Sequence, residues 1–256
     1  MKAAVLVEID QPLAIKEVEL TNLQVGQVLV KILVSGLCGA QLHEIRGHKG
    51  NAKFLPHLMG HEGCGIVQEV GPGVTTVKVG DKVVMHWRPG TGIESSFPSY
   101  VMDGKNMSSG KVTTLSEYSI VSENRLTTVP QDTPPELCAI LGCALTTAMG
   151  IIDNEVDLKF GESVAVIGTG GVGLNLIQVA AMKSACPIIA VDNNPSKKDL
   201  CVEMGAQEFY TSIDEISLAK IDVVIDTTGI PEVISKGISI LSNAGRMVLV
   251  GQPAPG

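Results

Sequence analysis

Aromatic side chains and positive charges are scarce in this chain of 256 residues. Phe, Trp and Tyr together make up 3% of the sequence, and 19 Lys and Arg residues are outnumbered by 27 Asp and Glu residues. The resulting formal charge of −8 disfavours nucleic acids and anionic membranes as partners, because no basic surface would offset the repulsion. We therefore expect the ligand to be a small molecule.

The sequence also lacks a secretory signal and a long membrane-spanning run. Its N-terminus carries Glu8 and Asp10 where a signal peptide would be first basic and then apolar. The longest uncharged run, residues 137–152, is short for a membrane span and is interrupted by glycine and threonine, which favours a buried helix. These absences predict a cytoplasmic protein that does not contact a membrane.

Cysteine occurs six times, but not in the spacing of a disulfide framework or of a self-contained zinc module. No CxxC pair is present, and the cysteines are widely separated. Four of them are predicted to be core residues: Cys64, Cys138, Cys186 and Cys201. Cys38 and Cys143 are candidates either for the core or for a metal site.

The chain changes its sequence pattern near the Pro134-Pro135 pair. Before it, short β-rich segments alternate with Gly, Pro and Asp turns, which is typical of a barrel or sandwich. After it, apolar strands alternate with amphipathic helices, which predicts a parallel sheet covered on both faces. We therefore expect two domains, residues 1–150 and residues 151–256. The Gly- and Ser-rich segment 88–117 is expected to form a long surface lobe.

The second half is expected to alternate strands and helices with short connections. Strands are predicted at residues 163–167, 187–192, 221–226 and 246–250, with a further short one near 207–211. Helices are predicted at residues 171–183, 195–204 and 230–241. This order is that of a doubly wound α/β fold.

A glycine-rich turn between the first of these strands and its helix predicts a dinucleotide site. The turn contains Gly168-x-Gly170-x-x-Gly173, with Gly171 and Val172 at the start of the helix. Such glycines permit a tight turn and a close approach of a pyrophosphate to backbone amides. An ordinary glycine-rich turn is the alternative, but the acidic residue that ends the next strand makes it less favourable.

That acidic residue, Asp192, can accept both hydroxyls of the adenosine ribose, and its charge would repel a 2′-phosphate. NAD is therefore favoured over NADP as the cofactor. Lys197 lies five residues later and could partly compensate the carboxylate, or could simply begin a solvated helix.

Three further residues are candidates for a metal site, although their spacing alone is no zinc signature. Cys38, His61 and Cys143 are separated by 23 and 82 residues. Each of them could equally be a core residue, because free cysteine is often buried and a single histidine is often structural.

The order of the motifs resembles that of the zinc-dependent medium-chain alcohol dehydrogenases over residues 1 to 251. The matching stretches are GLCG followed by His43, then GHEGCGIVQEVGPGVTTVKVGDKVV, then LGCALTTAMG, and then VIGTGGVGLNLIQ. The resemblance implies a GroES-like barrel followed by a Rossmann domain. It also implies hydride transfer between NAD and an alcohol, aldehyde or ketone, with one catalytic zinc ion.

The resemblance assigns roles residue by residue. Cys38, His61 and Cys143 correspond to the three protein ligands of catalytic zinc, which leaves a fourth position for water or substrate. Glu62 corresponds to the carboxylate that approaches the metal during ligand exchange, although a structural carboxylate is the alternative. His43 corresponds to a proton relay, or else it is a solvent-facing residue.

Two more residues correspond to positions around the substrate. Thr147 matches the hydroxyl beside the nicotinamide. Trp87 stands where the family often has a substrate-facing residue, and an ordinary packing aromatic is the alternative.

The sequence departs from the family pattern near the first zinc cysteine. Ala40 replaces the usual hydroxyl residue, Gln41 replaces an aspartate that supports the zinc histidine, and Gly39 supplies no charge for the pyrophosphate. A glutamine oxygen could still accept the second N–H of His61, but as a neutral and weaker acceptor. Residues 88–117 contain no cysteine, so the second, structural zinc of many relatives is not expected.

The sequence printed here stops at Gly256, just after the predicted fifth strand of the parallel sheet, where the family continues. A fragment or a short natural form would explain this, and the unpaired sheet edge favours association into a homo-oligomer. Two alternatives to the zinc dehydrogenase follow. One is a zinc-free reductase of the same fold, which the Cys38, His61 and Cys143 set disfavours; the other is a catalytically silent NAD-binding module.

Overall fold

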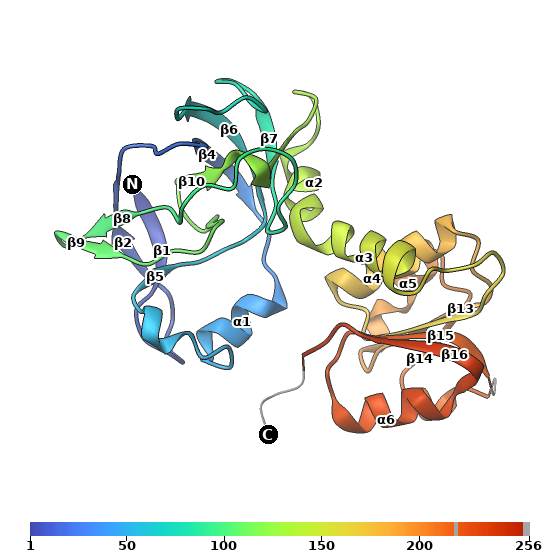
Figure 1. Ribbon diagram of the computed structural model, residues 1–256. Helices are drawn as coiled ribbons and strands as arrows, with labels where there is room; N and C mark the ends of the chain where they lie inside the picture. Colours follow the sequence, from blue (N-terminus) through green and yellow to red (C-terminus); the bar gives the residue numbers. More distant parts are fainter. Residues whose placement is uncertain (218–219, 253–256) are drawn as a thin grey trace. The chain divides into compact units, whose positions relative to one another are not determined.

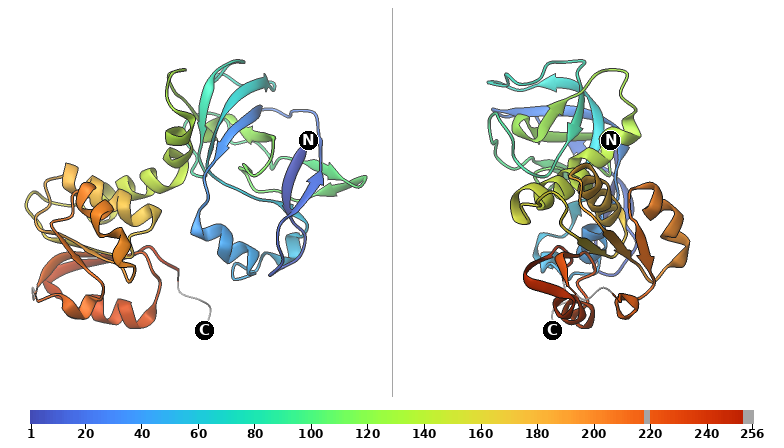
Figure 2. Two further views of the ribbon diagram at one scale, coloured as in Figure 1. Left: turned by 180° about the vertical axis from the view of Figure 1, so that it is seen from behind. Right: turned by 90° about the vertical axis from the view of Figure 1, so that its right-hand side faces the viewer.

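The computed structural model describes residues 1–217 and 220–252, except for the side chains of residues 51 and 52. Its contacts divide the chain into two compact units, one from Met1 to Cys143 and the other from Ala144 onward. Figure 1 and Figure 2 show the first unit in blue to yellow-green and the second in yellow to red. The last residues of the predicted second domain, 253–256, lie outside the described residues.

The largest sheet of the first unit is antiparallel and five-stranded, in the order β10-β4-β6-β7-β11. In that order, its strands are Tyr118–Ser122, Gln27–Ser35, Gly63–Val70, Lys82–Met85 and Leu126–Thr128. Valines such as Val28, Val30 and Val67 point into its core, as expected from β-branched residues on a half-buried face. The sequence prediction of a β-rich first half is therefore confirmed.

Two smaller antiparallel sheets complete the first unit. One has the order β2-β1-β5 (Ala14–Glu17, Lys2–Leu6 and His57–Leu58), and the other has the order β3-β8-β9 (Glu19–Leu20, Tyr100–Met102 and Lys105–Met107). The helices of this unit are α1, Gly39–Ile45, and α2, Pro135–Ile140, with short 3₁₀ turns at Asn51–Phe54 and Glu123–Arg125. Strand β4 leads into α1, so the barrel places this helix directly after its longest strand.

The second unit contains a parallel sheet in the order β14-β13-β12-β15-β16. In that order, its strands are Glu208–Tyr210, Ile188–Val191, Val164–Ile167, Ile221–Asp226 and Leu241–Leu249. Its helices are α3, Thr146–Gly150; α4, Gly171–Met182; α5, Lys198–Glu203; and α6, Pro231–Ser239, with 3₁₀ turns at Pro195–Lys197 and Ile213–Glu215. All predicted strands and helices of this half are present.

Helices cover both faces of this sheet, with α4 and α6 on opposite sides (Figure 1). Alternate strand residues face opposite sides, so Val164 and Val166 pack with α4 while Ala165 and Ile167 belong to the core cluster on the other face. Both sets are apolar, which explains why the strands appear as continuous hydrophobic runs. The predicted class, a GroES-like β-rich domain followed by a doubly wound α/β sheet, is confirmed.

The apolar run between the two halves forms one continuous helical stretch, Pro135–Glu155, in which α2 and α3 are each followed by a π-helical segment. By length and composition this stretch could cross a membrane, a test that core helices also pass. Its Ile151 and Ile152 side chains are buried. The predicted cytoplasmic location and lack of membrane contact therefore stay predictions.

Two expectations about individual segments are wrong. Segment 88–117 is not only a surface lobe, because it contains β8 and β9 and the fully buried Tyr100. The backbone N–H of Ile120 donates to the Tyr100 hydroxyl at 2.8 Å, which ties this segment to the barrel. Cys186 is exposed and is not a core residue, whereas Cys64, Cys138 and Cys201 are buried as predicted.

Candidate functional site

Three residues that are far apart in the sequence bring their metal-binding atoms together in the first unit. The ligand atoms of Cys38, His61 and Cys143 all lie within 4.8 Å of one another. Two thiols and one imidazole are a donor set that suits zinc. The residues present therefore fit the metal that the sequence analysis predicts.

Local structure explains how each of the three reaches the site. Cys38 caps the N-terminus of α1, His61 precedes β6, and Cys143 lies in the π-helical segment Leu141–Leu145 after α2. Strands β4 and β6 are paired with Ser35 opposite Gly63, so the residues just beyond these positions emerge at the same end of the sheet. The π-helical turn is of a kind that is frequent at functional sites.

The neighbouring donors favour the ionised form of Cys38. Hydrogen bonds from Cys143 and then from His61 lower the pKa of the Cys38 thiol from 9.0 to about 4, against the opposing effect of burial. The thiolate is the form of cysteine that binds metals. The thiolate form of Cys38 is therefore favoured beside the other two donors.

The Gln41 side chain binds the backbone of the first sulfur donor. Its side-chain oxygen accepts the backbone N–H of Cys38 at 2.9 Å and so closes the first turn of α1. A second hydrogen bond to this oxygen from His61 stays a prediction, because an amide oxygen has two lone pairs. The consequence for the site is that Gln41 fixes the backbone of the first sulfur donor.

Glu62 is buried beside the residues that carry the two sulfur donors. A Cβ atom at Gly36 would lie 2.7 Å from the Glu62 carboxyl carbon, and one at Gly142 would lie 3.1 Å from Glu62 Cβ. Gly36 is two residues before Cys38, and Gly142 directly precedes Cys143. Glycine at both positions therefore leaves the space that the Glu62 side chain occupies.

Two other predicted residues lie on helices. His43 is on α1, half-buried, with its ring edge-to-face against His48 at a centroid distance of 5.4 Å. Thr147 is on α3 in the second unit, and it is also half-buried.

The glycine-rich turn of the second unit has the features of a phosphate-binding turn. Gly168 has φ +85°, which favours glycine, and a Cβ atom at Gly173 would lie 2.0 Å from the Gly168 carbonyl oxygen. By contrast, a Cβ atom at Gly170 or Gly171 would meet nothing within 4 Å. The local fold thus requires glycine at 168 and 173. Gly170 and Gly171 instead leave open space at the N-terminus of α4, where a dinucleotide pyrophosphate would fit. Val172 follows on the same turn of α4 and packs against the core.

Asp192, at the end of β13, is buried and strongly hydrogen-bonded. Its carboxylate accepts the backbone N–H of Thr169 at 2.8 Å, that of Asn194 at 3.0 Å, and the Lys197 ammonium at 2.8 Å. Burial raises the pKa of this carboxyl, but the hydrogen bonds, led by that from Lys197, outweigh burial and lower it overall. The carboxylate is therefore held ionised beside the glycine-rich turn.

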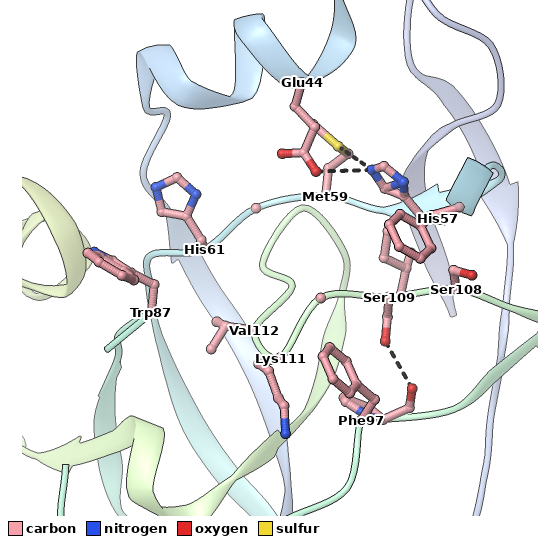
Figure 3. Close-up of a pocket in the computed structure, with 15 residues that line it drawn as sticks. Glu44, His57, Met59, His61, Trp87, Phe97, Ser108, Ser109, Lys111 and Val112 are labelled. Carbon is pink, nitrogen blue, oxygen red and sulfur yellow. Dashed lines mark hydrogen bonds and ion pairs between the residues drawn. The ribbon is translucent and has the colours of Figure 1, made fainter. Parts of the chain in front are cut away.

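A cavity of about 600 Å³ lies within the first unit and includes the metal-site histidine in its wall. Figure 3 shows His61, Trp87 and Phe97 around the same hollow, with Glu44 reaching from α1 to the His57 ring. The His57 Nε2 and Glu44 Oε1 atoms are 3.2 Å apart. Burial lowers the pKa of His57, which outweighs the opposing effect of Glu44.

Sequence analysis missed Phe97, Glu44 and His57 as cavity residues. Phe97 and His57 belong to residue types that are rare in this chain, since Phe occurs 4 times and His 5 times, whereas Glu44 carried no such signal. Contacts between distant segments are needed to bring such residues together, and single-sequence patterns do not encode them.

Comparison with protein families gives two matches along the chain. Residues 24–131 match the alcohol dehydrogenase GroES-like domain, and residues 171–256 match the zinc-binding dehydrogenase family. The first stretch contains the metal donors Cys38 and His61, and the second contains Gly171, Val172 and Gly173 at the start of α4.

Named relatives and solved structures agree with these matches. An S-(hydroxymethyl)glutathione dehydrogenase of Synechocystis is 34% identical over 89% of this chain and 68% of its own length. Alcohol dehydrogenase 6 of Peromyscus maniculatus is 32% identical over 99% of this chain and 76% of its own length. Benzyl alcohol dehydrogenase from Acinetobacter calcoaceticus has a TM-score of 0.87 at 26% identity, covering 100% of this chain and 78% of that one.

Proposed function

Because this chain belongs to the zinc-dependent alcohol dehydrogenase family and is an oxidoreductase of that type, we propose that it interconverts an alcohol and its carbonyl compound with NAD. The observation that carries the proposal is the convergence of Cys38, His61 and Cys143 within 4.8 Å. We assign them as the ligands of a single catalytic zinc.

The bound groups and the protein residues have separate tasks. When bound, zinc supplies Lewis-acid polarisation of the substrate oxygen and NAD supplies the hydride acceptor or donor. Cys38, His61 and Cys143 hold the metal, and Gln41 keeps the Cys38 backbone in place. Glu62 supplies a buried carboxylate beside the chain segments that carry both sulfurs.

The second unit binds the cofactor in this proposal. The open space over Gly170 and Gly171 receives the pyrophosphate, with Val172 and Gly173 completing the first turn of α4. Asp192 receives the adenosine ribose. Thr147 is assigned to the nicotinamide end of the cofactor, from its match to the family motif.

Turnover tests this function directly. Purified protein, mixed with NAD and a panel of primary and secondary alcohols, should generate NADH, and the matching aldehydes and ketones should consume NADH. Failure of every alcohol and carbonyl compound in the panel, with NAD binding intact, would favour the catalytically silent module instead.

We expect the parent protein to prefer NAD over NADP and Asp192→Ala to reduce that preference about 10-fold or more. The variant loses the charge that repels a 2′-phosphate and leaves the Lys197 ammonium without its 2.8 Å partner. Calorimetric titration with both cofactors measures the ratio. Asp199→Ala, which removes an exposed carboxylate from α5, is the matched control and should leave the ratio unchanged. Equal affinities in the parent protein would contradict the role of Asp192.

Proton transfer is assigned to His43. Ala40 has no hydrogen-bonding side chain, and His43 lies three residues further along α1 on the same face. We expect His43→Gln to lower kcat for alcohol oxidation about 10²-fold, the usual scale of general acid–base help, with a smaller change in KM. His48→Gln removes the exposed ring that touches His43 and is the control. Equal rates for both variants, with hydride transfer rate-limiting, would contradict the relay.

A further inference from the structure

Helix α1 carries two groups of the proposed site but is held by little apolar packing. Its N-cap is the proposed zinc ligand Cys38, and the proposed relay His43 lies in its last turn. Gln41 is the one buried residue of this helix, and Leu42 is 55% exposed. A helix of 7 residues is not stable by itself in water. Polar contacts with the rest of the first unit therefore have to fix its position.

The segment that carries the next proposed ligand, residues 57–61, is held firmly by its backbone. It begins with β5, which is paired with β1. Further along, the Met59 carbonyl oxygen accepts the backbone N–H of Thr114 at 3.0 Å and that of Leu115 at 3.1 Å. The backbone that leads to His61 is therefore fixed, and a side chain bonded to this segment gains a fixed anchor.

A side-chain contact joins α1 to this anchored segment. The His57 Nε2 atom lies 3.2 Å from Glu44 Oε1 and 3.3 Å from the sulfur of Met59. Figure 3 shows Glu44 reaching from α1 to the His57 ring. A carboxylate accepts hydrogen bonds and donates none, so the imidazole N–H is the donor in this contact. Glu44 thus ties the last turn of α1 to β5.

The contact is shielded from water and does not need a charged imidazole. The His57 side chain is 7% exposed and that of Glu44 is 26% exposed. Burial lowers the pKa of His57 and outweighs the opposing effect of Glu44, so the ring is neutral near pH 7. A neutral N–H therefore donates to a carboxylate, and a hydrogen bond to an ionised acceptor is stronger than one between neutral groups.

Both partners are close along the chain to proposed zinc ligands. Glu44 lies six residues after Cys38, on the helix that Cys38 caps, and His57 lies four residues before His61. We propose that Glu44 and His57 are a positioning pair of the metal site. By fixing α1 against the anchored segment, the pair sets where the Cys38 sulfur lies relative to the His61 ring. This proposal rests on the proposed function and deepens it.

Zinc affinity measures the effect of the pair without turnover. We expect Glu44→Ala to lower zinc affinity about 10-fold, the lower end of the range for residues that support zinc ligands. Glu44→Gln keeps an oxygen that accepts the His57 N–H, so it should recover most of this loss. Competition with a chromophoric chelator gives the affinities. Glu162→Ala is the matched control, because it breaks the ion pair with Arg246 in the second unit and should leave zinc affinity unchanged.

A double-mutant cycle tests whether the two residues act through their contact. His57→Phe keeps a ring in the same space but removes the donor, so it should lower zinc affinity as much as Glu44→Ala does. The variant with both changes should lose little more than either single variant, because each change already removes the contact. Losses that multiply in the double variant would overturn the pair.

Cobalt(II) reports the geometry of the same site. It binds the donor types that bind zinc, and its visible absorption depends on how the ligands are arranged around it. With cobalt at saturating concentration, Glu44→Ala and His57→Phe should shift the visible absorption bands. Glu44→Gln and Glu162→Ala should give the parental spectrum, since a general loss of stability does not move the ligands of a folded protein.

The outcomes separate this proposal from the function beneath it. Parental zinc affinity and a parental cobalt spectrum in Glu44→Ala would overturn the positioning pair while the zinc dehydrogenase stands. A parent protein that binds neither zinc nor cobalt would overturn the metal site itself, and the role of the pair with it.

Discussion

Cys143→Ser is expected to lower the affinity for zinc about 100-fold or more and to reduce alcohol oxidation to background. Serine keeps its proton near neutral pH and is a poor zinc ligand, whereas cysteine binds as the thiolate. In other proteins, mutation of a residue that merely supports a zinc ligand already lowers metal affinity about 10- to 100-fold. Loss of a ligand itself should therefore lower the affinity further. Competition with a chromophoric chelator measures the affinity, and NADH formation measures the rate.

The control for this prediction is Cys186→Ser, because Cys186 is exposed and belongs to the second unit. That variant should bind zinc and turn over as the parent protein does. Thermal unfolding of both variants shows whether the first unit remains folded. A folded Cys143→Ser protein with parental zinc affinity would remove Cys143 from the ligand set.

Gly173→Ala is expected to lower the stability of the fold, whereas Gly170→Ala is expected to lower the affinity for NAD. At Gly173 a new Cβ atom would lie 2.0 Å from a backbone oxygen, so the free energy of unfolding should fall by about 1–3 kcal/mol as in other overpacked interiors. At Gly170 the φ of −73° suits alanine and no atom lies within 4 Å, so stability should change by less than about 0.5 kcal/mol.

Cofactor affinity should distinguish the same two positions. Gly170→Ala fills space in which the backbone would approach the pyrophosphate, so we expect NAD affinity to fall about 10-fold or more in a fully folded protein. Urea unfolding and calorimetric titration give the two quantities. Unchanged NAD affinity in Gly170→Ala would show that the pyrophosphate binds elsewhere.

Strong local patterns made the second unit predictable from sequence. Continuous apolar runs such as Val164–Ile167 and Ile188–Val191, each followed by a helix, leave few alternatives to a parallel sheet. Strand β16 is the exception, because it begins at Leu241 and not near residue 246 as predicted. The polar residues Ser242 and Asn243 concealed the start of this strand, where the pairing with β15 is irregular.

The first unit was harder to predict because its contacts are long-range. Tyr100 is buried through a hydrogen bond to a backbone group 20 residues away, and nothing in its polar, Gly-rich neighbourhood indicates this. Cys186 shows the converse error, since the general tendency of cysteine to be buried does not hold at this exposed connection.

The spacing of residues along the sequence is not sufficient to predict the metal site. Residues 23 and 82 positions apart carry no local signature, and only the resemblance of the motifs grouped Cys38, His61 and Cys143. The structure adds the pairing of β4 with β6 and the π-helical turn that carries the third donor. It also shows the Gln41 oxygen accepting the Cys38 backbone N–H, a contact that the sequence analysis did not predict.

Zinc content tests the central claim most directly. Elemental analysis of protein expressed in zinc-replete medium should give one zinc per chain, and replacement of Cys38, His61 and Cys143 together should reduce it to nearly none in a chain that still binds NAD. Absence of zinc from the parent protein, or the same zinc content in the triple variant, would contradict the assignment of these three residues as the catalytic metal site.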